Sequence, residues 1–174
     1  SALALGDHIV SVNSFSKYFN MTGWRLGWLV LPEALVAPME RLAQNLFICP
    51  SALAQHAALA CFEPEALALY RQRQGEFRAR RDFIVPALRE LGFGVPVEPD
   101  GAFYVYLDCS AFGPDASALA AELLERAGVA LVPGEDFGTH EPQRHMRLSY
   151  ATSMPQLHEA VRRLRAWRDG RAPG

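Results

Sequence analysis

The sequence predicts a mixed α/β chain in which the end of a large α/β domain, residues 1–75, precedes a small α+β domain, residues 76–174. Three observations support this prediction. Two strand-like apolar runs come before helical segments in the first 75 residues. One long amphipathic pattern covers residues 65–91, and short strand-like runs separated by helices follow it. The long helix would therefore join the two domains.

The first 75 residues indicate two strands followed by two helices. The apolar runs at residues 8–14 and 24–30 have the length of strands. Pro32 suits the first position of a helix, where no N–H is needed, so we expect a helix from there to about residue 47. Pro50 and the serine after it start an alanine-rich helix that is expected to reach residue 62.

The long helix is predicted by an apolar stripe with a seven-residue spacing. The stripe consists of Tyr70, Phe77, Ile84 and Leu91. Five arginines fall largely off this stripe, and no aromatic residue accompanies them. We therefore expect them to form a solvated helix face: Arg71, Arg73, Arg78, Arg80 and Arg81.

The carboxyl-terminal part alternates short strands with two helices. Strands are expected where β-rich runs follow turn residues, at residues 102–107, 129–133 and 145–151. A helix over residues 115–127 should end at Gly128. The last helix should begin with a capping box of Ser153 and Gln156, and it should bury Leu157, Val161 and Leu164.

The composition argues against several classes of partner and site. The net charge of −2 and the lack of a basic patch interleaved with aromatics give no indication of nucleic-acid binding. No apolar run approaches the length of a membrane span, and no signal peptide is recognisable, so we expect a cytoplasmic protein. The three cysteines, Cys49, Cys61 and Cys109, lie far apart in the sequence and suggest packed thiols in a reducing compartment. No pair of histidines has the spacing of metal ligands.

Lysine is almost absent from the sequence. The chain has sixteen arginines and one lysine, Lys17. Arginine can replace lysine wherever only a positive charge is needed, but it cannot supply a primary amine that loses its proton and acts as a nucleophile. The single lysine is therefore a candidate for a chemical role.

Two motifs surround this lysine. They are Ser14-Phe15-Ser16-Lys17 and Met21-Thr22-Gly23-Trp24-Arg25-Leu26-Gly27-Trp28. A site for pyridoxal phosphate (PLP) requires a lysine amine for the aldehyde and hydrogen-bond donors for the phosphate dianion. At this spacing the motifs resemble the cofactor-lysine segment of fold type I aminotransferases, in the broad class I/II branch. The resemblance implies that Lys17 carries PLP as a Schiff base and acts as the catalytic acid and base. It also implies that Ser14, Ser16 and Arg25 bind the cofactor.

Three further segments match the same family downstream, in the expected order. Pro99-Asp100-Gly101-Ala102-Phe103-Tyr104 is similar to the strand that opens the small domain. Residues 132–138 are similar to the loop that closes toward the active site. Met146-Arg147-Leu148-Ser149-Tyr150-Ala151 resembles the strand whose arginine binds the substrate α-carboxylate, which makes Arg147 the expected substrate anchor. We expect its neighbour Arg144 to be a solvated loop residue.

The resemblance identifies the chain as the carboxyl-terminal half of such an enzyme. It implies an aminotransferase that acts on an amino acid and a 2-oxo acid, works as a homodimer and needs no metal. The chain alone should be inactive, because the family's partner for the ring nitrogen lies in the other half. Two alternatives stay open: an aminotransferase-like effector domain of a transcriptional regulator, and another fold type I PLP enzyme such as a C–S lyase.

The sequence does not reveal the amino acid on which the enzyme would act. Arg41 is the one arginine in residues 34–55, and its position looks helical and exterior, so a dicarboxylate specialist is not favoured. The apolar segment Phe47-Ile48-Cys49-Pro50 leaves aliphatic and aromatic amino acids as options.

Overall fold

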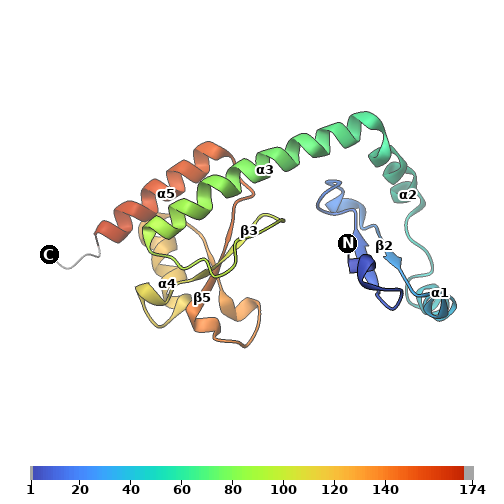
Figure 1. The fold of residues 1–174 in the computed structure, drawn as a ribbon, viewed down its shortest axis with the longest axis horizontal. Coiled ribbons are helices and arrows are strands. Elements are labelled where there is room, and N and C mark those ends of the chain that lie inside the picture. Colours follow the sequence, from blue (N-terminus) through green and yellow to red (C-terminus); the bar gives the residue numbers. More distant parts are fainter. Residues whose placement is uncertain (1, 171–174) are drawn as a thin grey trace. The chain divides into compact units, whose positions relative to one another are not determined.

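The computed structural model describes residues 2–170, so the outermost residues of both predicted domains, Ser1 and residues 171–174, lie outside the described part. The chain divides into two compact units, Ser1–Arg73 and Gln74–Gly174. The boundary falls within the long helix α3 (Pro64–Leu91), which Figure 1 shows in green. Each unit has a hydrophobic cluster of its own, and the predicted mixture of helices and strands is confirmed.

The first unit begins with an antiparallel hairpin. Strand β1 (Ser11–Ser14) pairs with β2 (Gly27–Val30), and Ser14 lies opposite Gly27. Both strands are shorter than predicted. The expected start of the second strand at Trp24 is wrong, because Thr22–Trp24 forms a 3₁₀ turn and the residue after it has a left-handed backbone.

Two helices follow the hairpin. Helix α1 (Glu33–Phe47) begins one residue later than predicted. Pro32 has an extended ψ of 142°, so it is the N-cap and not the first helical residue. Helix α2 (Ala52–Leu59) is capped by Ser51, whose side chain accepts a hydrogen bond from the N–H of Ala54, the third residue of the helix. The predicted extension to residue 62 is a 3₁₀ turn, Ala60–Phe62.

Most of the large apolar side chains of the first unit are exposed. They come from the hairpin and from both helices, and they include Val12, Trp28, Leu29, Val30, Leu35, Val36, Leu42, Leu46, Phe47, Ile48, Leu53 and Leu59. Exposed apolar side chains in this number indicate a surface that binds something when they lie next to one another. Cys49 follows this exposed stretch and is itself exposed, so the prediction that all three cysteines are packed is wrong for Cys49. Cys61 and Cys109 are buried.

The second unit contains a three-stranded antiparallel sheet. Its strands are β3 (Tyr104–Asp108), β4 (Val132–Pro133) and β5 (His145–Ser149), in the order β3-β5-β4. The central strand places Arg147 opposite Tyr106 on one side and Val132 on the other. The predicted strand over residues 129–133 is shorter than expected, because only its last two residues pair.

Three helices cover one face of this sheet. Helix α4 (Ala116–Glu122) is capped by Asp115, continues as a π-helical turn and ends at Gly128, whose φ is 63°. Helix α5 (Met154–Asp169) begins with the predicted capping box of Ser153 and Gln156. Together with the second half of α3, these helices bury the core residues Ile84, Leu88, Val105, Leu107, Leu119, Leu123, Met146, Leu148, Leu157, Val161 and Leu164.

The predicted stripe along α3 is confirmed, and it serves both hydrophobic clusters. Tyr70 is buried in the cluster of the first unit. Ile84 and Leu91 are buried in the core of the second unit, and Phe77 packs against that core while partly buried.

Among the described residues, no helix is long and apolar enough to cross a membrane.

The core of the second unit provides a test of the fold. Leu164 on α5 is fully buried, whereas Leu124 is 53% exposed in the same unit. Leu164→Ala should lower the free energy of unfolding by about 2–5 kcal/mol, because it leaves a cavity. Leu124→Ala, the same chemical change at the surface, should alter it by less than about 0.5 kcal/mol. Denaturant unfolding measures both, and equal losses would contradict the described core.

Candidate functional site

The single lysine lies in the loop between β1 and β2, residues 15–26, here called the lysine loop. The two ends of the loop are fixed to each other, because the Phe15 N–H donates to the Leu26 carbonyl at 3.0 Å. This bond extends the ladder beyond the pairing of Ser14 with Gly27. A Cβ on Gly27 would lie 2.5 Å from the Asn13 carbonyl oxygen, so only glycine allows the two strands to approach this closely.

Two phenylalanines anchor the lysine loop on either side of Lys17. The ring of Phe15, which is 7% exposed, lies 4.8 Å from the ring of Phe19. Phe15 also packs on Trp28 at 5.0 Å, and Phe19 packs on Phe62 and Tyr70, both at 5.6 Å. Lys17 itself is exposed. The loop therefore buries Phe15, two positions before the lysine, partly buries Phe19, two positions after it, and leaves the lysine accessible.

Hydrogen bonds brace the backbone next to the lysine. The Ser16 N–H donates to the Ser14 hydroxyl oxygen at 3.0 Å, and the Thr22 hydroxyl donates to the Ser16 carbonyl at 2.6 Å. The backbone of Ser16 is thus held from both sides of the loop. Because the Ser14 oxygen accepts in this contact, its own O–H proton remains available for a ligand.

Arg25 ends the 3₁₀ turn in a left-handed conformation, with a φ of 52°. A non-glycine residue in this region is uncommon and often marks a functional position. Its Nη1 donates to the Thr22 carbonyl at 2.8 Å. Within residues 2–170, no further acceptor is found for its other guanidinium donors, and no carboxylate pairs with it.

These residues fit the chemistry of an aldehyde cofactor that carries a phosphate. Within the described part of the chain, the Lys17 amine has no hydrogen bond or ion pair that would hold it elsewhere. The Ser14 hydroxyl and the Arg25 guanidinium are exposed on the same hairpin and still have donors to give. Arginine and hydroxyl donors are the groups that suit a phosphate dianion.

The second candidate residue lies on the open face of the sheet in the second unit. Strand β5 alternates, so Met146 and Leu148 point into the core while Arg147 lies on the opposite face. The Arg147 guanidinium carbon is 4.2 Å from the centre of the Tyr104 ring and 4.3 Å from the centre of the Phe137 ring. The cation is therefore held between two aromatic faces.

The charge of Arg147 is not neutralised by a carboxylate. None of the ion pairs between described residues includes it, and its buried Nε has no hydrogen-bond partner among residues 2–170. Buried polar atoms without a partner are rare in folded proteins, and each one calls for an explanation. A bound carboxylate would supply the missing acceptor.

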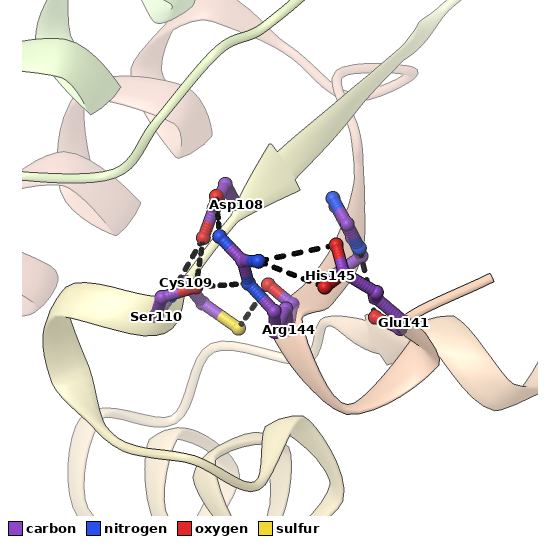
Figure 2. Close-up of polar contacts among 6 residues, drawn as sticks. All are labelled: Asp108, Cys109, Ser110, Glu141, Arg144 and His145. Carbon is purple, nitrogen blue, oxygen red and sulfur yellow. Dashed lines mark hydrogen bonds and ion pairs between the residues drawn. The ribbon is translucent and has the colours of Figure 1, made fainter.

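The neighbouring Arg144 is 46% exposed, as expected of a solvated loop residue. Its guanidinium also forms several contacts that the sequence did not predict. Figure 2 shows its guanidinium between Asp108, Ser110 and Glu141. Nη1 donates to both Glu141 carboxylate oxygens at 3.0 and 3.1 Å, Nε donates to Ser110 Oγ at 2.9 Å, and Nη2 donates to Asp108 Oδ2 at 3.3 Å.

Sequence reasoning missed the two aromatic residues that lie against the Arg147 guanidinium. Tyr104 and Phe137 stand in segments that matched family motifs, but neither was given a role. The period-2 alternation of residues 104–108 could have placed Tyr104 on the face of Arg147. No local signal could have indicated Phe137, because it reaches Arg147 from a loop.

Comparisons with known proteins agree with these motifs. The family model for aminotransferase class I and II matches residues 1–164. The chain is 42% identical over 158 residues to a valine–pyruvate aminotransferase of Mycobacterium tuberculosis, which covers 91% of this chain and 41% of that protein. It is 38% identical over 159 residues to an aspartate/prephenate aminotransferase of Thermus thermophilus, and the match covers 90% of this chain and 40% of that protein.

Solved structures show the same relationship. A crystal structure of an aminotransferase from Mycobacterium tuberculosis superimposes with a TM-score of 0.92 and 40% identity, over 98% of this chain and 44% of that one. Aspartate aminotransferase from Thermus thermophilus with maleate superimposes with a TM-score of 0.83 and 36% identity, over 95% of this chain and 42% of that one. The chain spans about two fifths of the length of the curated relatives it matches.

The Asp108 carboxylate provides a test of the contacts around Arg144. Hydrogen bonds from the Ser110 hydroxyl and N–H, followed by the charge of Arg144, hold the pKa of Asp108 below its ordinary value of 3.8. The stabilisation is therefore present above that value and is lost as the pH falls through the lowered pKa. The Tm difference between the wild type and Asp108→Asn should shrink between pH ~6 and ~3. A constant difference across this range would contradict the described contacts.

Proposed function

Because this chain belongs to the family of class I and II aminotransferases, we propose that the full-length protein moves an amino group between an amino acid and a 2-oxo acid with PLP as its cofactor. The observation that carries the proposal is the lysine loop. Its single lysine is exposed and is held between two packed phenylalanines, on the same hairpin as Ser14 and Arg25. The relatives reported above are all named as aminotransferases, so neither a regulator nor a lyase is favoured.

The residues of the lysine loop would hold the cofactor. Lys17 Nζ would bond to its aldehyde carbon, and Ser14 and Arg25 would donate to its phosphate, with Ser16 fixing the turn between them. When bound, PLP supplies an electron-poor ring that stabilises negative charge at the substrate α-carbon. The first unit would then be the end of the large PLP-binding domain, and the second unit the small domain.

Two cations would act on the substrate. Lys17 Nζ, once freed by the incoming amine, would accept the proton of the α-carbon as a general base and deliver it to the cofactor carbon attached to the substrate nitrogen as a general acid. Arg147 binds the α-carboxylate that amino acids and 2-oxo acids share. Its planar fork suits a carboxylate, and its unpartnered Nε supports this role.

We infer that the amino acid has an aliphatic or aromatic side chain. The side chain of Arg41 is exposed on α1 and bonds its own helix through the Ala37 carbonyl at 3.4 Å, so it is not prepared for a second carboxylate. The relative with 42% identity is named for valine and pyruvate. Turnover of valine, phenylalanine and aspartate with pyruvate by the full-length protein tests this inference, and a preference for aspartate would reject it.

We also propose that the enzyme is a cytoplasmic homodimer. The exposed apolar side chains of the hairpin and α1 support a protein partner for the first unit. Free thiols at all three cysteines support a reducing compartment. Light scattering on the full-length protein would test the dimer, and a monomer at micromolar concentration would count against it.

The chemical role of Lys17 can be separated from its charge. Lys17→Arg keeps the positive charge but removes the deprotonatable amine, so kcat should fall by about 10²- to 10⁴-fold. The kcat of Lys17→Ala should fall by a similar factor. Part of this activity should return when ethylamine is added, because a free amine can then accept the proton. Initial rates of 2-oxo acid formation measure both effects. Near-wild-type activity in Lys17→Arg would eliminate the proposed role.

The role of Arg147 predicts a change in substrate affinity. Removing one partner of a desolvated charge pair costs about 2–5 kcal/mol, so Arg147→Ala should raise KM by at least about 30-fold. The affinity for PLP should remain unchanged. Arg162→Ala, which removes an exposed arginine paired with Glu159, is the control and should leave KM unaltered. If both variants behave alike, Arg147 is a structural residue.

A further inference from the structure

Phe137 reaches Arg147 from the loop formed by residues 134–142, here called the phenylalanine loop. The start of this loop is held by Gly134, which is buried where an added Cβ would collide with the Pro142 carbonyl and approach the Tyr106 hydroxyl. The Phe137 N–H donates to the Gly134 carbonyl at 2.9 Å. The position of Phe137 therefore depends on how both ends of the loop are fixed to the sheet.

Arg144 fixes the other end of the phenylalanine loop. Its guanidinium joins Glu141, at the end of the loop, to Asp108 at the end of β3 and to Ser110 beyond that strand. The Cys109 N–H donates to the Arg144 carbonyl at 2.8 Å, so the backbone is tied at the same point. Three acceptors from two segments that are distant in the sequence thus meet on one side chain.

The backbone at the end of the loop would not hold this shape readily by itself. Glu141 has a φ of 44°, in the left-handed region that a glutamate seldom adopts. Its carbonyl contacts the Arg144 N–H at 3.0 Å and His145 Nδ1 at 2.9 Å, while its carboxylate receives Arg144 Nη1. The contacts of Arg144 therefore offset the strain at this residue.

These contacts matter more for the loop than for the core. The Arg144 side chain is 46% exposed, and exposed ion pairs contribute little to global stability. The core lies on the opposite face of the sheet, among Val105, Leu107, Met146 and Leu148. Loss of Arg144 should accordingly leave the second unit folded and release the phenylalanine loop.

We propose that Arg144 is a positioning residue for Arg147. It holds the phenylalanine loop against the sheet, which keeps the ring of Phe137 over one face of the Arg147 guanidinium while Tyr104 covers the other. The two rings hold the guanidinium in one plane and leave its edge to receive a carboxylate. This inference rests on the proposed function in one respect, namely that the ligand of Arg147 is the substrate carboxylate.

The proposal predicts a specific kinetic pattern in the full-length protein. Arg144→Ala should raise KM for the amino acid and for the 2-oxo acid by a similar factor of about 10, because both bind through a carboxylate and misplaced positioning groups cost up to about 100-fold. The decrease in kcat should be smaller than the rise in KM. Arg144→Lys keeps the charge but cannot reach three acceptors, so its KM should lie between those of the wild type and Arg144→Ala.

Arg89 provides a matched control. It is also 46% exposed and forms one ion pair with Glu98 in the same unit. Arg89→Ala should change neither KM nor the hydrogen exchange of residues 134–142, whereas Arg144→Ala should accelerate that exchange. Exchange does not depend on catalysis, so it tests the loop even if the full-length protein transfers no amino group. Titration of each variant with 3-methylbutanoate, a carboxylate without an amine, measures the Arg147 site independently of turnover.

A double variant tests whether Arg144 acts through Phe137. Phe137→Leu should raise KM, and adding Arg144→Ala in that background should cause little further rise, because the ring that Arg144 positions is already gone. Full additivity of the two effects would overturn the proposal, as would unchanged exchange of the loop in Arg144→Ala. An inactive wild type that still binds 3-methylbutanoate would reject the proposed function and leave the positioning role to be decided by exchange and titration.

Discussion

The chemistry proposed for this chain depends on the pair of phenylalanines on either side of its lysine. A lysine side chain has about 2 kcal/mol of rotamer entropy, and an unanchored loop would add backbone freedom to it. Phe15 and Phe19 restrict the backbone freedom of the loop, because they pack against each other and against Trp28, Phe62 and Tyr70. The hairpin, the 3₁₀ turn Ala60–Phe62 and the start of α3 are all needed to build that contact.

The two cations to which the proposed reaction assigns a role have similar surroundings. Aromatic rings, rather than carboxylates, lie next to Lys17 in sequence and around Arg147 in space. Packed rings can hold a side chain or its loop without neutralising the charge, so the cation stays available for a ligand. Arg144 shows the opposite arrangement, since Asp108 and Glu141 use its charge, and this makes it suitable as a clamp.

Features with a local cause could be predicted from the sequence. The stripe along α3 and the capping box at Ser153 arise from residues close together in the chain, and both are confirmed. Features that depend on distant contacts could not. The start of β2 depends on the left-handed Arg25, and the contacts of Arg144 join it to residues about 35 positions away. Lys17 could be singled out as a candidate because arginine cannot supply its deprotonatable amine, which is a constraint on one residue type; its role stays a prediction.

One measurement tests the central claim about the lysine loop most directly. The full-length protein is incubated with PLP and reduced with borohydride, which makes the bond between the cofactor and its lysine permanent, and the labelled peptide is then identified by mass spectrometry. The account predicts that the cofactor is found on Lys17, in the peptide that contains Phe15 and Phe19. A label on another lysine, with Lys17 unmodified, would contradict it.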